Sequence, residues 1–317
     1  MSMGKRKPTP ALEIHLLREG IIESRHHAEV AVCDERGRVL ATAGHLETSY
    51  FVRSALKPFQ ALAVTTTGTL EQFELSDRDL AIMCASHKGH LEQVRQVFNI
   101  LWRCDVEPSA LRCPIPVGKN SPLEHTCSGK HAGMLAVCQQ RNWPLQTYPQ
   151  LRHPLQHLIL EKLADLLKMP ADEFIAARDD CGVPTYCLEL SQMATLYAKL
   201  ASGESLALER MVRAMVHHPT LVSGTGNFDT DLMELAAGEI VSKAGAEGIQ
   251  CIGRIGEGMG LAIKVADGAK RAKCAAAIHI LKELGWITPT VADTLAERYL
   301  TLSDCQRLEV LGELSMI

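Results

Sequence analysis

The sequence lacks the features that mark several large functional classes. No apolar run reaches the length of a membrane span, and the first residues have no apolar stretch like that of a signal peptide. There is no positive excess either, because 33 Lys and Arg accompany 37 Asp and Glu, which gives a formal net charge of −4. We therefore expect a cytoplasmic protein that has neither a membrane nor a nucleic acid as its partner.

The sequence also lacks the paired CxxC spacings of a zinc knuckle and any internal repeat or low-complexity tract. Its 11 cysteines are an odd number scattered over 317 residues, which fits reduced, mostly buried thiols better than a disulfide framework. Hydrophobic residues make up 46% of the chain. The chain can therefore bury a substantial core, as one large domain or two coupled ones.

The hydrophobic pattern predicts strands near both ends of the chain and helices between them. Strand-like runs cover 11–18, 28–34, 38–43, 239–244, 249–255 and 259–266. Helical spacing covers 91–104, 130–141, 154–168, 189–202, 205–217 and 268–284. We expect an α/β (α+β) fold with a mainly antiparallel sheet built from both chain ends, flanking helices and a helical middle section. The expected parts are 11–72 with 239–285 around the sheet, a mainly helical 73–238, and a C-terminal helix and tail at 286–317.

The clearest indication of chemistry is the segment RSALKP, which runs from Arg53 to Pro58. Proline is tolerated only in the first turn of a helix, so we expect a helix to begin near Ser54. Residues three apart share a helix face, so the Lys57 amine should reach the Ser54 hydroxyl and activate it as a nucleophile. Taken alone, this short motif is a weak signal and fits a capped helix with a solvated lysine better than a nucleophile.

Two further loops carry thiols. CSGKHAGM begins at Cys127 and places an amine, Lys130, and an imidazole, His131, close behind it, while DDCGVPT carries Cys181. Two thiolates with one nitrogen ligand would suit tetrahedral zinc, provided that the lysine loses its proton. Two single cysteines so far apart are also consistent with buried thiols that bind nothing.

A later strand-like run delivers Lys243 to a glycine-rich turn in SKAGAEG. An SxxK motif followed by a KxG on a strand is the order found in penicillin-recognising serine enzymes. Here Ala244 replaces their hydroxyl residue, and no SDN triplet lies between the two motifs. Ser86 in the loop CASHKGH is the nearest candidate for a second cleft hydroxyl, and His87 in the same loop is a candidate to line the site.

These segments together resemble a known family. SALKPFQ, CASHKGH, CSGKHAGML, DDCGVPT, HPTLVSGTGNFDTDLM, SKAGAEG and GLAIKVADGAKRA, in this order, are similar to the rhizobial-type L-asparaginases, also called asparaginase II or class 3. The resemblance covers about residues 11–285. It implies a fold related to serine β-lactamases and glutaminases, a homodimer, and hydrolysis of L-asparagine to L-aspartate and ammonia.

The resemblance also implies roles for particular residues. The family's two serine–lysine pairs correspond to Ser54 with Lys57 and Ser86 with Lys243, and its zinc ligands, one ion per subunit, to Cys127, Lys130 and Cys181. We take Arg53, His87, Asp179 and His131 as candidate substrate-binding residues. Two departures from the family pattern are Asp180, where a glycine is expected, and His125-Thr126, where asparagines commonly precede CSGK.

We expect Ser54 to be the nucleophile and Ser86 to be its rival. Arg53 or zinc would anchor the α-carboxylate or α-amino group of the substrate. Two alternatives stay open at this point. One is a related amidase that acts on glutamine, an acyl-amino compound or a β-lactam, and the other is a noncatalytic protein that binds zinc or an amino acid.

Overall fold

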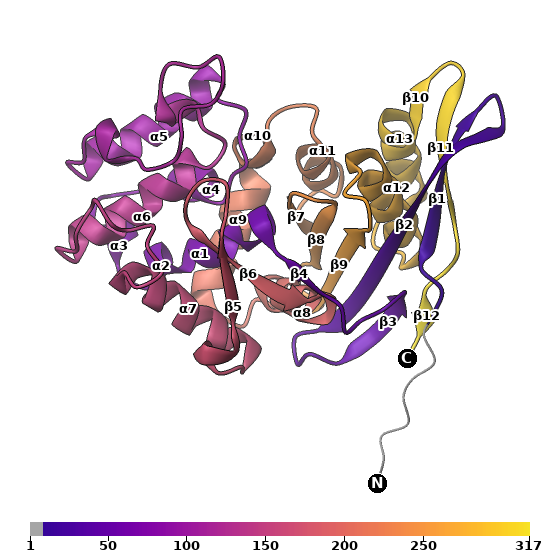
Figure 1. Cartoon of the computed structure of the whole chain (residues 1–317), viewed down its shortest axis with the longest axis horizontal. Coiled ribbons are helices and arrows are strands. Elements are labelled where there is room, and N and C mark those ends of the chain that lie inside the picture. The colour runs from indigo at the N-terminus through magenta and orange to yellow at the C-terminus, as the bar shows by residue number, and fades with distance from the viewer. Residues whose placement is uncertain (1–8) are drawn as a thin grey trace, which may run out of the picture.

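One antiparallel sheet collects strands from both ends of the chain (Figure 1). In the computed structural model, which describes residues 9–317, the strands follow the order β10-β11-β1-β2-β9-β8-β7, and β3 pairs with β2 and β12. Their bounds are β1 Leu12–Arg18, β2 Ile21–Asp34, β3 Val39–Ala43, β7 Ile240–Ala244, β8 Ile249–Arg254, β9 Met259–Val265, β10 Thr301–Ser303, β11 Gln306–Leu311 and β12 Ser315–Met316. The antiparallel sheet predicted from the two chain ends is confirmed.

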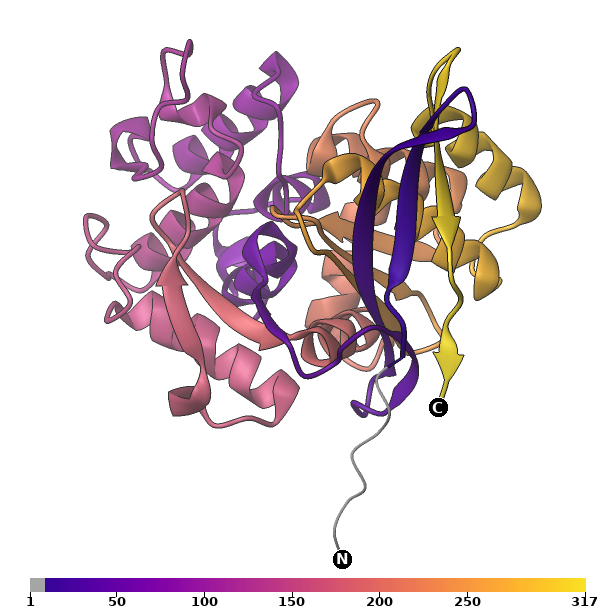
Figure 2. The same ribbon diagram turned by 45° about the vertical axis from the view of Figure 1, so that its right-hand side comes forward.

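Different helices cover the two faces of this sheet, because side chains alternate along each strand. On β2, Val30 packs in the core shared with α12 (Lys270–Glu283) and α13 (Pro289–Tyr299). The next residue, Ala31, packs in the other core, which includes α8 (Leu190–Ala201). In Figure 2 the orange helix α12 and the yellow helix α13 lie behind the long indigo strands.

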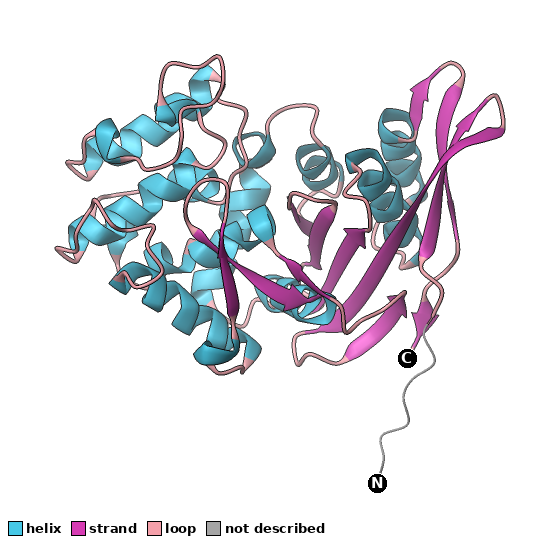
Figure 3. Ribbon diagram, in the orientation of Figure 1, coloured by secondary structure: helices cyan, strands magenta, loops and turns pink. Residues whose placement is uncertain are grey.

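Most of the remaining helices form the other half of the molecule, whereas α11 (Phe228–Leu235) packs in the core shared with α12 and α13 (Figure 3). The others are α1 Lys57–Gln60, α2 Leu62–Thr65, α3 Thr69–Gln72, α4 Asp77–Met83, α5 Leu91–Arg103, α6 Ser128–Gln140, α7 Pro154–Leu167, α9 Leu206–His217 and α10 Pro219–Ser223, with 3-10 turns η1 Arg53–Leu56, η2 Pro108–Ala110, η3 Pro122–Glu124 and η4 Ala171–Glu173. The long helices predicted in this region are confirmed to within two residues at each end. Within residues 9–317, no helix has the length and apolar character needed to span a membrane.

A second, three-stranded sheet takes two of its strands from the section predicted to be helical and one from the 11–72 segment. It has the order β4-β6-β5, with bounds β4 Ser49–Phe51, β5 Ile175–Arg178 and β6 Pro184–Glu189. These strands are too short to show a reliable two-residue period, and β4 pairs with β6 from a segment far away in the sequence. This small sheet matters for function because β4 leads into Ser54 and β6 follows the loop that carries Cys181.

The C-terminal segment also contributes strands that the sequence did not predict. The C-terminal helix expected within 286–317 is present as α13, but the tail after it forms β10, β11 and β12. β11 pairs with β1, with Ile14 opposite Val310 and Leu16 opposite Leu308. The sheet thus extends beyond the 239–285 segment, because these short strands gain their stability from partners at the other end of the chain.

Two glycines let α8 lie directly on the sheet. Gly253 of β8 and Gly260 of β9 are cross-strand neighbours under this helix. A Cβ on Gly260 would lie 2.0 Å from Ala194 O and 2.4 Å from Ala198 N, both of them backbone atoms of α8. Backbone atoms cannot rotate away, so any side chain at this position forces the helix off the sheet.

We expect Gly260→Ala to lower the free energy of unfolding by about 3 kcal/mol, which is the upper part of the range for overpacked cores. Urea denaturation of both proteins measures the difference. The control is Gly20→Ala in an open turn with φ +86°, where a Cβ meets nothing within 4 Å. There, only the left-handed backbone costs stability, about 1 kcal/mol. Equal losses in the two variants would contradict the proposed steric contact.

Candidate active site

A cavity of about 310 Å³ lies where the edge strand β7 meets the helical half. Its lining comes from η1, the loop after α4, the segment before α6, the start of α11, the β7–β8 turn and the first turn of α12. The lining residues are Ser54, Ser86, Lys88, Thr126, Ser223, Asn227, Phe228, Asp229, Lys243, Ala244, Gly245, Ala246, Glu247, Gly248, Gly268, Lys270 and Lys273. Both predicted serine hydroxyls and one of the predicted lysines therefore share one cavity.

Ser86 is held between two buried lysine amines. Its Oγ lies 3.0 Å from Lys57 Nζ and 2.9 Å from Lys243 Nζ, and both lysine side chains are fully buried. Lys57 also donates to Ala85 O at 2.6 Å and to Thr126 O at 3.4 Å. Three acceptors thus match the three N–H bonds of an ammonium group.

The hydrogen bond expected between Lys57 and Ser54 does not form in this structure. Among residues 9–317, Ser54 Oγ has no hydrogen-bond partner, because the Lys57 amine turns toward the loop after α4.

Ser76 fixes the start of α4 through a capping box with Asp79, as its sequence predicts. The loop that carries Ser86 leaves the other end of this helix and is secured by a bond from Ser86 N to Val222 O at 2.8 Å.

Lys243 is the amine best suited to accept a proton. Burial lowers its pKa to about 7, and the positive charges of Lys57 and Lys273 act in the same direction, while Asp229 opposes them. Lys243 Nζ also lies 2.9 Å from Ala244 O. Above neutral pH this amine is largely uncharged, within hydrogen-bond distance of a serine hydroxyl.

Asp229 is a buried carboxylate that the sequence analysis did not single out. One of its oxygens accepts hydrogen bonds from Ser242 Oγ and Gln250 Nε2, both at 2.8 Å, and the other accepts from Ala244 N at 2.9 Å. Burial alone would raise its pKa, but Lys243 and the other nearby donors lower it overall. The charge of Asp229 holds the end of β7 in place beside Lys243. No short motif in the sequence marks this role, because Asp229 is one of two aspartates in FDTD. Only the tertiary structure shows which of the two contacts β7.

Ser54 follows a residue with an unusual backbone. Arg53 has φ +54°, which is rare for a residue other than glycine, and such positions cluster at functional sites. Its N–H donates to Thr185 Oγ1 at 3.1 Å, while Val52 N donates to Tyr186 O at 3.0 Å. The small second sheet therefore positions the serine.

Arg53 itself is committed to the loop that carries Cys181. Its Nε donates to Asp179 at 2.7 Å, and its Nη2 donates to Asp180. Asp179 is buried, whereas the Asp180 side chain is exposed. Asp180, which stands where a glycine is expected, thus gives Arg53 a second carboxylate partner. Neither Arg53 nor Asp179 lines the cavity.

The three residues expected to bind zinc are all buried and lie close together. The Cys181 thiol donates a hydrogen bond to Cys127, which lowers the pKa of Cys127 well below its usual value despite burial. Burial opposes a charge on Lys130, but the two thiols raise the pKa of its amine. A thiolate with a second thiol and an amine beside it is a donor set that zinc accepts. Within residues 9–317, no three His, Cys, Asp or Glu side chains converge to hold a metal, so this site needs Lys130 as its third ligand.

The two histidines in the chemical loops are buried and do not line the cavity. His87 accepts a hydrogen bond from Gly89 N at its Nδ1, so its Nε2 donates to Ser128 Oγ at 2.8 Å. His131 Nδ1 is hydrogen bonded to the hydroxyl of Tyr148. Burial lowers the pKa of His87 to about 3, so both contacts fit neutral rings that hold loops in place. Their predicted substrate contacts stay a prediction.

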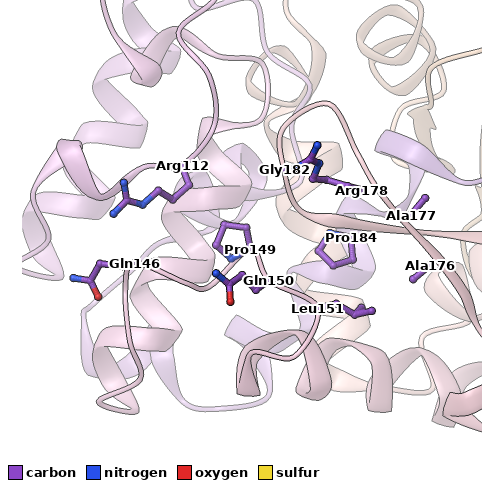
Figure 4. Close-up of a pocket in the computed structure, with 10 residues that line it drawn as sticks. All are labelled: Arg112, Gln146, Pro149, Gln150, Leu151, Ala176, Ala177, Arg178, Gly182 and Pro184. Carbon is purple, nitrogen blue, oxygen red and sulfur yellow. The ribbon is translucent and has the colours of Figure 1, made fainter.

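A larger cavity of about 430 Å³ lies on the other side of the Cys181 loop (Figure 4). Its lining includes Arg112 and Arg178, two glutamines and several small apolar residues. It contains none of the predicted nucleophiles, bases or thiols. We therefore place the candidate active site in the cavity around Ser54 and Ser86, where hydroxyls and amines meet.

The comparisons with known proteins identify the family of this chain. The chain matches the L-asparaginase II family over residues 14–316. No curated protein was found to match it. Among solved structures it is similar to Mglu, with 17% identity and a TM-score of 0.39 over 82% of this chain and 67% of that one. It is also similar to the β-lactamase Mb2281c from Mycobacterium bovis, with 15% identity and a TM-score of 0.45 over 86% and 95% of the two chains.

Other Mglu structures are covered over 59–64% of their length, so the chain spans about three fifths to two thirds of that protein. The family match, by contrast, extends over nearly the whole of the sequence. The protein belongs to the L-asparaginase II family of amidohydrolases.

Proposed function

We propose that this amidohydrolase is an L-asparaginase, which converts L-asparagine to L-aspartate and ammonia by serine–lysine catalysis. The observation that carries the proposal is the position of Ser86 Oγ between the amines of Lys57 and Lys243, in a cavity that Ser54 also lines. Such an arrangement provides a nucleophile and a base, and the path for protons is complete once Ser54 Oγ comes within hydrogen-bond distance of Ser86 Oγ in the substrate complex.

Ser54 is the proposed nucleophile, because its hydroxyl faces the cavity without a partner and its backbone follows the strained Arg53. Ser54 Oγ attacks the side-chain amide carbon. Its proton passes to Ser86 Oγ, while the proton of Ser86 passes to neutral Lys243 Nζ. The proton then returns by the same route to the leaving nitrogen, the C–N bond breaks, and ammonia leaves an ester on Ser54. Water attacks this ester with the same proton transfers, which releases L-aspartate.

Lys57 has a different part in this scheme. Its ammonium group, held by two carbonyl oxygens, donates to Ser86 Oγ and keeps that hydroxyl aligned for proton transfer. Its three N–H bonds are already used, so it acts on the negative charge that develops on the amide oxygen only through its own positive charge.

Cys127, Lys130 and Cys181 would hold one zinc ion per chain, since their buried donors are close together and one thiol already has a lowered pKa. When bound, zinc supplies a Lewis acid that can fix a substrate group. Thr126, next to Cys127, lines the cavity and its backbone oxygen accepts a hydrogen bond from Lys57, so the segment that carries Cys127 also contacts the serine–lysine residues.

Ser54→Ala is expected to lower kcat for ammonia release from L-asparagine by at least about 10³-fold, because it removes the nucleophile. Ser86→Ala removes only the proton path and is expected to cost about 10²-fold to 10³-fold. Quenched-reaction mass spectrometry should find the acyl group on the peptide that contains Ser54. Retained turnover in both variants would rule out the serine mechanism, and an acyl group on Ser86 would reverse the two roles. L-Glutamine, assayed in parallel, tests the related glutaminase activity.

Activity is expected to rise with pH through about 7. Lys243 must be neutral to accept a proton, and its pKa is lowered to about 7. Below this pH, kcat/KM for L-asparagine should fall about tenfold per pH unit, and above about pH 8 it should level off. Asp229→Asn removes a negative charge that raises this pKa, so its inflection should move to lower pH. A flat profile between pH 6 and 9 would argue against Lys243 as the base.

Metal analysis of the purified protein is expected to find about one zinc per chain. Cys127→Ser and Cys181→Ser should each reduce this content strongly, since a serine hydroxyl is a poor zinc ligand. Cys187→Ser is the control, because this half-buried thiol lies on β6, outside the proposed ligand set. A parent protein that takes up no zinc on dialysis against it would refute the site, whatever its activity.

A further inference from the structure

Lys273 is a buried lysine that the proposed reaction does not use. It lies in the first turn of α12, its residue is only 4% exposed, and it lines the active-site cavity. Among residues 9–317, no carboxylate lies within 4.0 Å of its amine, and no hydrogen bond holds it. The amine is not among the fully enclosed unpaired groups of this part of the chain, so it reaches the cavity, where an anionic partner can meet it.

The acidic residues of the cavity do not provide that partner. Both oxygens of Asp229 are occupied by three other donors, and Glu247 is exposed in the β7–β8 turn. The cavity is lined by four lysines and only these two acids. The charge of Lys273 lowers the pKa values of both Lys243 and Asp229, so it acts directly on the catalytic region. Asp229 therefore offsets part of this charge, and the cavity still carries an excess of positive charge beside the reacting groups.

We infer that Lys273 binds the α-carboxylate of the substrate, an inference that rests on the proposed function. An anion that enters the cavity supplies the missing partner and relieves repulsion between Lys273 and the other lysines. L-Asparagine carries this carboxylate on the carbon next to the methylene group that bears its amide. Arg53, the anchor expected from the sequence, already pairs with Asp179 and Asp180 and lies outside the cavity lining.

The test compares two amides in the intact enzyme and in Lys273→Met. L-Asparagine has the carboxylate, whereas β-alaninamide is the same molecule without it. At pH 9, where Lys243 is neutral with or without the nearby charge, the variant should lose about 10-fold to 100-fold in kcat/KM for L-asparagine, mainly through KM. Its kcat/KM for β-alaninamide should change less than about threefold.

Lys282→Met is the matched control, because it removes the same charge from an exposed position near the other end of α12. It should leave both substrates unaffected. An equal loss for both amides in Lys273→Met would show that Lys273 only supports the fold or the base, and no loss for either would also overturn the inference.

Binding separates failure of the inference from failure of the proposed function. If the parent does not hydrolyse L-asparagine, calorimetry with L-aspartate still reports on the carboxylate site. The inference predicts that L-aspartate binds to the parent at least about tenfold more tightly than to Lys273→Met. Equal affinity, or no binding to either protein, would refute it.

Discussion

The arrangement that the rest of the site depends on is the pair of buried lysine amines on either side of Ser86 Oγ. Two amines this close cannot both be charged in a buried environment without strong repulsion. The structure resolves the conflict by giving them different surroundings. Lys57 donates to two carbonyl oxygens, whereas the pKa of Lys243 is lowered to about 7. One hydroxyl thereby contacts a donor and an acceptor.

Close backbone packing makes this geometry possible. A Cβ on Gly129 would lie 2.0 Å from Ile82 O, so α6 can rest against the end of α4 only because this residue is glycine. The contact places the loop after α4 beside the start of α6, and Lys57 bonds to both segments. On the other side, the small sheet β4-β6-β5 ties the Ser54 turn to the loop that carries Cys181. The site is therefore assembled from both halves of the molecule.

The electrostatics of the site divide into two regions. Around Cys127 and Cys181, a thiolate and a lysine balance each other in a closed, buried cluster. In the neighbouring cavity, the lysines outnumber the acids, and Asp229 is committed to the backbone and side chains near β7. A buried region with surplus positive charge favours an anionic ligand, which is the chemistry expected for an amino acid substrate.

The sequence by itself determined the fold class, the position of the long helices to within two residues, and the segments that carry the serines, lysines and thiols. Periodicity and motif spacing are local properties, and they suffice for these features. The homodimer implied by the resemblance stays a prediction. Only the tertiary structure decided which side chains meet. Lys57 is hydrogen bonded to Ser86 and not to Ser54. Arg53 pairs with two aspartates. Asp229 and Lys273 line the active-site cavity although no motif in the sequence marks them. Hydrogen bonding and desolvation depend on distances between segments far apart in the chain, and these distances are set by packing.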